Sequence, residues 1–324
     1  MSKISLKPAS PVRHFQRVLA FSIIFPSYFS SLAQDTKKSA DLLFHRAYYF
    51  LSIDTNKAID LLDQCIQQDS TFKDAYFHRG IAYFKLAEYE KSLTDFNKAQ
   101  ALDPELHIIW MYKGFANRNL GLLDKALTNF SNYIIHNPTD TTAYSYILRG
   151  KMKYELGDFD GAVEDYDMAV KLRPFQEKYH YYRFIALYEA KKYDEALQAA
   201  SSLIEITPDF YGYYFYKGNV YHDLQFYDSA IYMYNIAIIK NYQNADSYFY
   251  RGQSYQAKKE LKKALEDYNT AIILKDSDGS YFSARGNCKF DMNDKKGACD
   301  DWDIAGGLGY YEDFDKVKRI CDSQ

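Results

Sequence analysis

The residues of this chain that could carry chemistry are seven histidines, four cysteines and many aspartates and arginines. The histidines show neither an i, i+4 pair nor an acidic partner at metal-ligand spacing. The segment 276–279 begins like a calcium-binding loop but has no later acidic ligand at loop spacing. The glycine-rich run 306–309 lacks the strand and the Lys-Ser or Lys-Thr of a phosphate loop. We therefore expect no catalytic residues, no metal and no cofactor, and do not expect an enzyme.

The cysteines are concentrated at the C-terminus, where Cys288, Cys299 and Cys321 lie within the last 37 residues. Cys288 and Cys299 are expected to face each other across a helical turn, so a disulfide between them would staple the last hairpin in an oxidising compartment. Cys321 could replace either partner, because a sequence does not define connectivity. Three buried thiols are the alternative.

The elements that position these residues follow from a repeated glycine. It occurs at Gly80, Gly114, Gly150, Gly218, Gly252 and Gly286, with an aromatic residue four positions before and a basic residue directly before. The intervals are 34, 36, 68, 34 and 34 residues. Each interval holds two segments with a helical apolar period, separated by a short turn. A fixed period of this length indicates stacked helix pairs.

The repeated segment resembles the tetratricopeptide repeat family. The family pattern has an aromatic residue at position 4, Gly at 8, Tyr at 11, Ala at 20, an aromatic residue at 24, Ala at 27 and Pro at 32. The segment 245–278 matches it with Tyr248, Gly252, Tyr255, Ala264, Tyr268 and Ala271. The segment 177–210 has Phe184 in place of the glycine, and the segment 39–72 has Arg46 there.

The resemblance implies an all-α fold, a right-handed superhelical solenoid of antiparallel helix pairs closed by a C-terminal capping helix. We expect a signal peptide at 1–33, a short segment at 34–38, the repeat array at 39–311 and the capping helix at 312–324. In order, repeats 1 to 8 cover 39–72, 73–106, 107–140, 143–176, 177–210, 211–244, 245–278 and 279–311.

The N-terminal segment has the composition of a secretory signal. Four basic residues precede an apolar stretch from Val18 to Phe29, and no acidic residue occurs before Asp35. Small residues at Ser31 and Ala33 predict cleavage after Ala33. An uncleaved anchor is the alternative, although the stretch is shorter than the roughly 20 residues a spanning helix needs. We expect an exported protein, periplasmic or secreted, with no membrane span after cleavage.

Position 7 is basic in every repeat from the second onward, and position 23 is aspartate in four of them. The expected ion pairs within one hairpin are Arg79 with Asp95, Arg149 with Asp165, Arg251 with Asp267, and Arg285 with Asp301. The planar guanidinium suits a carboxylate in this geometry. Lys113 and Lys217 face Asn129 and Met233 instead, and Arg183 faces Ala199. A structural role in fixing helix register is favoured over a basic ligand-binding row.

The resemblance also implies a concave groove lined by positions 2, 5, 9, 12 and 13 of the first helices. The candidate groove residues are Phe77, Ile81, Phe84, Met111, Phe115, Arg118, Ile147, Lys151, Tyr154, Tyr181, Tyr188, Phe215, Asn219 and His222. Packing between neighbouring repeats is the alternative role for each of them. No repeat has the Lys at position 5 with which some family members hold a C-terminal carboxylate.

These patterns predict a non-enzymatic protein–protein interaction scaffold of the cell envelope that binds a peptide or protein in its groove. A glycan-binding or small-ligand-binding accessory protein is the alternative, because 33 tyrosines offer rings that can stack on sugars. The net charge of −3 gives no basic surface for nucleic acid. The sequence leaves the partner and the oligomeric state undefined.

Overall fold

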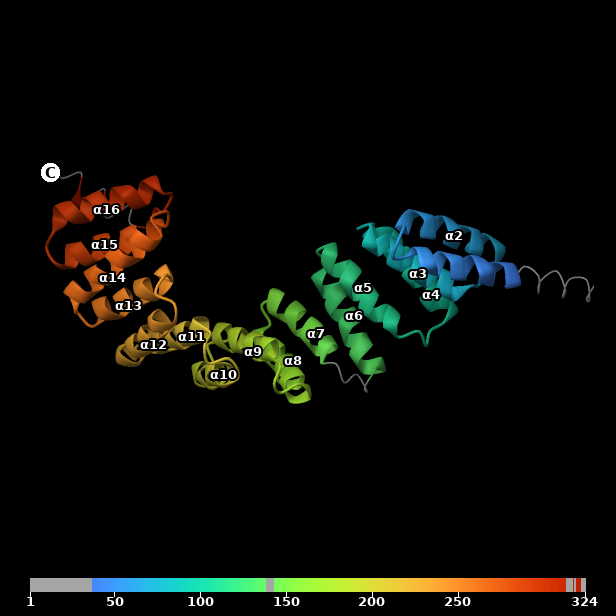
Figure 1. The fold of residues 1–324 in the computed structure, drawn as a ribbon, viewed down its shortest axis with the longest axis horizontal. Helices are drawn as coiled ribbons and strands as arrows, with labels where there is room; N and C mark the ends of the chain where they lie inside the picture. The colour runs from blue at the N-terminus through green and yellow to red at the C-terminus, as the bar shows by residue number, and fades with distance from the viewer. Residues whose placement is uncertain (1–36, 138–142, 313–316, 318, 322–324) are drawn as a thin grey trace, which may run out of the picture. The chain divides into compact units, whose positions relative to one another are not determined.

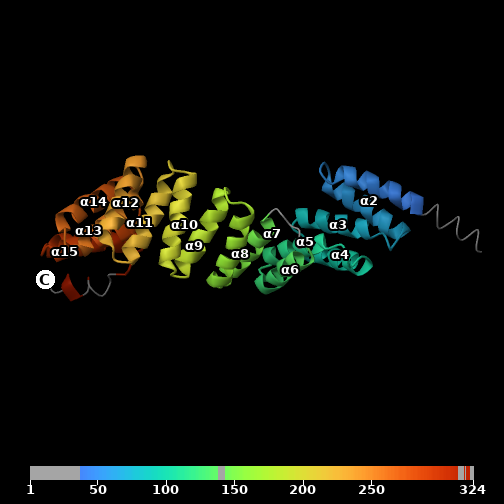
Figure 2. The same ribbon diagram turned by 90° about the horizontal axis from the view of Figure 1, so that it is seen from below.

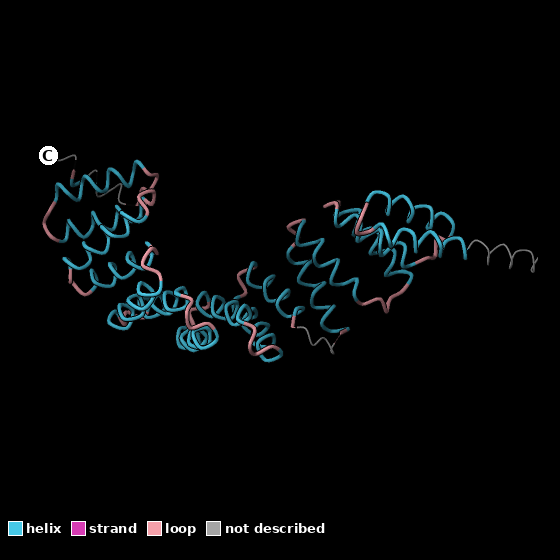
Figure 3. Tube along the Cα trace, in the orientation of Figure 1, coloured by secondary structure: helices cyan, strands magenta, loops and turns pink. Residues whose placement is uncertain are grey.

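The computed structural model describes residues 37–137, 143–312, 317 and 319–321. These residues form helices joined by short turns, and none of them is in a strand (Figure 3). The prediction of an all-α fold of stacked helix pairs is confirmed. The predicted signal peptide and most of the predicted capping helix lie outside the described residues. Within them, no helix combines the length and the apolar character that a membrane crossing requires.

Each repeat consists of a first helix, called A here, and a second helix, called B. The A helices of repeats 2 to 8 are α3 (Lys73–Lys85), α5 (Ile108–Asn119), α7 (Tyr144–Glu155), α9 (Glu177–Glu189), α11 (Tyr211–Asp223), α13 (Ala245–Ala257) and α15 (Gly279–Asp291). The B helices of the same repeats are α4 (Tyr89–Leu102), α6 (Leu123–His136), α8 (Phe159–Leu172), α10 (Tyr193–Ile206), α12 (Tyr227–Lys240), α14 (Leu261–Leu274) and α16 (Lys295–Gly307). Repeat 1 has a helix over residues 37–50 followed by α2 (Thr55–Gln68).

The chain divides into two compact units, residues 1–140 and 141–324. The first unit contains repeats 1 to 3. The second contains repeats 4 to 8, whose helix pairs follow one another from α7 to α16 (Figures 1 and 2).

The turn between the A and B helices has one conformation from repeat 2 to repeat 8. The residue at position 15 is left-handed in all seven, as in Gly157 (φ 80°) and Gln225 (φ 62°). The next residue donates its N–H to the carbonyl at position 11, for example Asp158 to Lys153 at 2.8 Å. This is the Schellman arrangement, which ends a helix by satisfying its last carbonyl groups. The same turn in each repeat gives each hairpin the same register.

The repeated glycine allows an aromatic ring of the B helix to lie directly against the A helix. A Cβ atom added to Gly218 would lie 2.5 Å from the ring of Tyr234, a residue that is fully buried. Three of the rings at position 24, those of Phe96, Tyr166 and Tyr234, also lie against a ring at position 6 of the next repeat. For Tyr234 and Tyr250 the ring centroids are 6.4 Å apart. One ring therefore joins the two helices of its own repeat to the following repeat.

Repeat 5 keeps this packing with the two residue types exchanged. Phe184 takes the place of the glycine, and position 24 is Ala200. Phe184 is 3% exposed and Ala200 is fully buried in the same apolar cluster. The ring of Phe184 lies 5.7 Å from that of Tyr216 at position 6 of repeat 6. The same distance separates Tyr166 from Tyr182 in the regular arrangement. The ring fills the same space from the opposite helix.

In repeat 1 the prediction that Arg46 takes the glycine position is wrong. Arg46 is exposed, whereas Ala47 is fully buried in one cluster with Leu62 of α2. The separation from Ala47 to Leu62 is 15 residues, compared with 16 from Gly80 to Phe96. A shift of one residue along the A helix places the small alanine at the crossing point and the arginine in solvent.

Candidate functional site

The A helices form the side of the array on which neighbouring repeats come closest. In the first unit α3 contacts α5, and in the second α11 contacts α13 and α13 contacts α15. No pair of neighbouring B helices in the described chain makes contact as extensive. An array whose A helices approach while its B helices spread is concave on the A side. The A-helix surface of each unit is therefore the candidate binding surface.

Most of the predicted aromatic groove residues pack against rings of their own repeat or of a neighbouring repeat. Their ring pairs, with centroid distances, are Phe77–Tyr112 at 5.4 Å, Phe84–Phe115 at 6.4 Å, Phe115–Phe130 at 5.5 Å, Tyr154–Phe159 at 5.2 Å, Tyr181–Tyr216 at 5.8 Å and Phe215–Tyr250 at 5.4 Å. Phe77 and Ile147 are buried, while Ile81, Met111 and the remaining rings are half-buried. These side chains build the wall of the surface and are only partly available to a partner.

The polar groove candidates also have partners within the chain. The ammonium group of Lys151 lies 4.5 Å from the ring of Tyr182. Asn219 accepts a hydrogen bond from the Tyr234 hydroxyl, and His222 Nδ1 lies 2.9 Å from the Ser254 hydroxyl. Burial lowers the pKa of His222, so it is neutral at pH 7. Of the fourteen candidates, Arg118 alone is exposed.

The A helices of the second unit carry a row of exposed carboxylates at position 13, which the sequence reasoning missed. This carboxylate row consists of Glu155, Glu189, Asp223 and Asp291, all of them exposed. The Tyr188 hydroxyl donates to Asp223 at 2.6 Å, and the Gln256 amide donates to Asp291 at 2.9 Å. Each of these bonds joins position 12 of one repeat to position 13 of the next. Tabulating position 13 by repeat would have revealed the row.

The four predicted arginine–aspartate pairs are present. In each, the guanidinium donates from Nε and Nη2 to the carboxylate of its own repeat. The distances from Nη2 are 2.6 Å for Arg79–Asp95, 2.6 Å for Arg149–Asp165, 2.6 Å for Arg251–Asp267 and 2.7 Å for Arg285–Asp301. The four aspartates are 2 to 5% exposed. Burial raises the pKa of Asp267 despite the lowering effect of Arg251. Desolvation thus offsets much of the Coulombic attraction, and the pairs define geometry more than they add net stability.

The same basic column also bonds backward to position 25 of the preceding repeat, a contact that the sequence reasoning missed. Nη1 of Arg251 donates to Asn235 at 2.6 Å, and Nη1 of Arg285 donates to Asn269 at 2.8 Å. The remaining contacts of this type are Arg79 to Asp63, Arg183 to Asp167 and Lys217 to Ser201. Arg183, which lacks a carboxylate in its own repeat, therefore pairs with the repeat before it. Each acceptor lies 16 residues before its donor.

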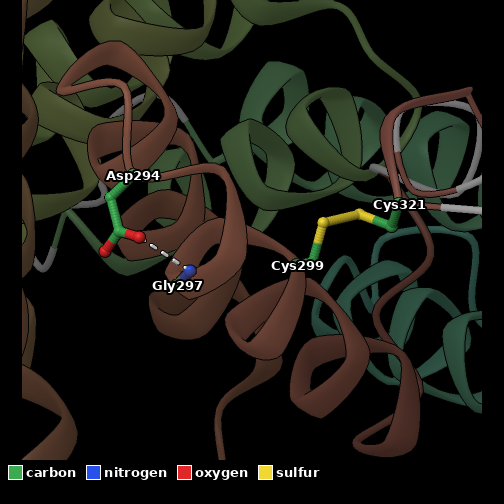
Figure 4. The surroundings of a disulfide bond; sticks show 4 residues. All are labelled: Asp294, Gly297, Cys299 and Cys321. Atoms are coloured by element: carbon green, nitrogen blue, oxygen red, sulfur yellow. Dashed lines mark hydrogen bonds between the residues drawn. A yellow bond between two sulfur atoms is a disulfide. The ribbon is translucent and has the colours of Figure 1, made fainter. Parts of the chain in front are cut away.

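The disulfide joins Cys299 to Cys321, so the predicted bond between Cys288 and Cys299 is wrong (Figure 4). The Cα atoms of Cys299 and Cys321 are 5.9 Å apart, an ordinary separation for a disulfide. Cys288 is fully buried, and its thiol donates to the carbonyl of Leu261 in the preceding repeat. The A-helix cysteine thus faces repeat 7, while the B-helix cysteine faces the C-terminal segment. The bond ties that segment to α16.

Among the described residues, no three His, Cys, Asp or Glu side chains are grouped as they would be around a metal ion. The buried aspartates at position 23 pair with the arginines at position 7. The surface offers rings, carboxylates and amides for recognition.

Comparison with known proteins supports the family resemblance. Profiles of the tetratricopeptide repeat match residues 74–106, 147–209 and 217–279. A TPR repeat-containing protein of Methanocaldococcus jannaschii is 25% identical over 186 residues, which is 50% of this chain and 31% of that protein. Anaphase-promoting complex subunit 3 of Schizosaccharomyces pombe is 29% identical over 124 residues, 38% of this chain and 18% of that protein. The chain thus spans less than a third of the length of these relatives.

A solved structure shows the same fold. The C-terminal part of a TPR repeat-containing protein from Cytophaga hutchinsonii superposes with a TM-score of 0.60. The superposition covers 76% of this chain and 98% of the other, at 17% sequence identity. At this identity the likeness concerns the architecture of helix pairs alone.

Proposed function

Because this chain belongs to the tetratricopeptide repeat family, whose members generally mediate protein–protein interactions, we propose that it is an interaction scaffold that binds a peptide with basic and apolar side chains. The carboxylate row on the A helices of the second unit carries the proposal. Glu189 and Asp223 lie in consecutive repeats beside the ring of Tyr188. An acidic row next to half-buried rings complements lysine or arginine side chains that alternate with apolar ones.

We also propose that the protein acts outside the cytoplasm. The basic and then apolar composition of residues 1–33 supports export. The Cys299–Cys321 disulfide supports an oxidising compartment. The mass of the protein recovered from cell fractions tests this part of the proposal. We expect a chain that begins at Gln34 in the exported fraction, and a full-length chain in the cytoplasm would contradict it.

Binding to the A-helix surface is tested with a labelled synthetic peptide of alternating lysine and leucine, measured by fluorescence anisotropy. The variant replaces Glu155 and Glu189 by glutamine and Asp291 by asparagine. The matched control makes the same change of charge on the B helices of the second unit, at Glu164, Glu195 and Glu266, all of them exposed.

We expect the A-helix variant to bind about tenfold more weakly at low salt, because each exposed charge contributes up to about 0.5 kcal/mol. The control should bind like the wild type, and the difference should shrink as salt screens the charges. Equal weakening by both variants would mean that net charge alone governs binding. Equal and unchanged binding by both would reject the carboxylate row.

A further inference from the structure

The basic column at position 7 contains a cation without an acidic partner in the first unit. Lys113 of α5 lies where other repeats have arginine, and position 23 of its repeat is Asn129. The Lys113 ammonium donates to Gln100 at 3.0 Å and lies 4.8 Å from the ring of Trp110. No carboxylate among the described residues forms an ion pair with it. Burial lowers the pKa of Lys113, because no negative charge offsets its desolvation.

An open cavity of about 440 Å³ lies directly at this ammonium group. Lys113 and Asn117 contribute one wall from α5, and Lys125, Thr128 and Asn129 contribute another from α6. In repeat 2 the corresponding cavity, of about 430 Å³, is lined by the Arg79–Asp95 pair and by Asp63. The repeat 3 cavity has Asn97 and Asn129 at the positions of Asp63 and Asp95, so neither position offers a carboxylate to Lys113.

The polar groups of the cavity favour a single negative charge. The amide nitrogens of Asn117 and Asn129 donate to backbone carbonyls one turn earlier, at 2.9 and 2.7 Å. The ammonium groups of Lys113 and Lys125 are therefore the charged donors of the cavity, and the Asn97 amide also lines it. Asp124 also lines the cavity, so the formal charge of its walls is +1. One carboxylate balances that charge, whereas a doubly charged phosphate would leave a net charge of −1 in the cavity.

We propose that this cavity binds a carboxylate group of a ligand, held by Lys113 with Lys125 as the second contact. The ligand carboxylate supplies the charge that position 23 supplies in repeats 2, 4, 7 and 8. The carboxylate belongs either to a small organic acid or to an aspartate or glutamate side chain of a peptide. The site lies in the first unit at the position-7 column, so it goes beyond the proposed function and does not depend on the carboxylate row.

The test uses the full chain and two probes, succinate and a peptide with blocked termini and one aspartate. Calorimetric titration at low salt measures both. Asn129→Asp is the informative variant, because it places a carboxylate beside Lys113 from within the repeat. We expect it to raise the melting temperature and to weaken binding at least tenfold. Lys113→Gln should weaken binding to the same extent by removing the cation.

Met233→Asp is the matched control, since it adds a carboxylate opposite Lys217 in repeat 6 and should leave binding unchanged. Binding of succinate assigns the site to small acids, and binding of the peptide alone assigns it to an acidic segment. Failure of both probes to bind would overturn the proposal. Binding that persists unchanged in Asn129→Asp and Lys113→Gln would also overturn it, because the carboxylate would then lie elsewhere.

Discussion

The exchange of Phe184 and Ala200 in repeat 5 gives a direct test of how the helix pairs are packed. The perturbation restores the regular arrangement in two steps, Phe184→Gly and Ala200→Phe, separately and together. Phe184 is 3% exposed and its ring contacts Tyr216 of the next repeat. If one ring fills one space from either helix, the two substitutions must compensate each other.

The size of each effect follows from burial. Loss of the Phe184 ring should lower the free energy of unfolding by about 3 to 5 kcal/mol. Glycine within α9 should lower it by about 1 kcal/mol more. Ala200→Phe alone brings a second ring into a space already filled and should cost about 3 kcal/mol. In the double variant the ring returns on α10, so the remaining loss should be about 1 to 2 kcal/mol.

Equilibrium unfolding in guanidinium chloride measures all four proteins. We expect the loss in the double variant to be at least about 3 kcal/mol smaller than the sum of the single losses, a coupling typical of residues that share one space. The reverse exchange in repeat 6, Gly218→Phe with Tyr234→Ala, is the matched control. Losses that add to within about 0.5 kcal/mol would refute the reasoning, because Phe184 and position 24 would then occupy different spaces.

Three further predictions concern single features of the fold. Burial raises the pKa of Cys65 and of Cys288 to about 11, so iodoacetamide at pH 8 should leave both thiols unmodified until denaturant is added, as mass spectrometry can show. Hydrogen bonds from a tyrosine and a threonine lower the pKa of Glu177, so its stabilising effect exists above about pH 4.5 and is lost on acidification through the lowered folded-state value. The difference in melting temperature between wild type and Glu177→Gln should therefore shrink below pH 4.5, and a constant difference would contradict this origin. Gly157 is left-handed with nothing within 4 Å of an added Cβ, so Gly157→Ala should cost about 1 kcal/mol, whereas Gln225→Gly should stabilise by about 0.5 kcal/mol in thermal melts.

The sequence could predict the contacts that form within one helical hairpin. Arg251 and Asp267 are 16 residues apart in one repeat, and the repeated turn places such residues opposite each other. The backward bond from Arg251 to Asn235 depends on how one repeat stacks on another, which the spacing within a hairpin does not define. For the same reason, the sequence could reveal the carboxylate row at position 13 but not its bonds to position 12 of the preceding repeat, from Tyr188 and Gln256.

The incorrect disulfide has a related cause. Cys288 and Cys299 are symmetric about the turn of repeat 8, and symmetry in a hairpin suggests contact. The A helix, however, also packs on the preceding repeat, and the Cys288 thiol points toward Leu261 there. Cys299 of α16 instead pairs with Cys321 in the segment that follows this helix.

Arg79, Arg251 and Arg285 each make a bond within their own repeat and a bond to the preceding repeat, and these two bonds act on different parts of the stability of a repeat array. That stability is close to a sum of a term for each repeat and a term for each interface. The Arg251–Asp267 bonds lie within repeat 7, whereas the Arg251–Asn235 bond crosses its interface with repeat 6.

Asp267→Ala leaves a half-buried guanidinium without its carboxylate and should lower the free energy of unfolding by about 3 kcal/mol. Asn235→Ala removes one hydrogen bond to a charged donor and should cost about 1.5 kcal/mol. Native-state hydrogen exchange separates the two terms, because the loss of an interface should loosen repeat 6 from repeat 7 and leave the hairpin of repeat 7 intact. Uniform loss of protection in both variants would mean that the arginine does not divide its role in this way.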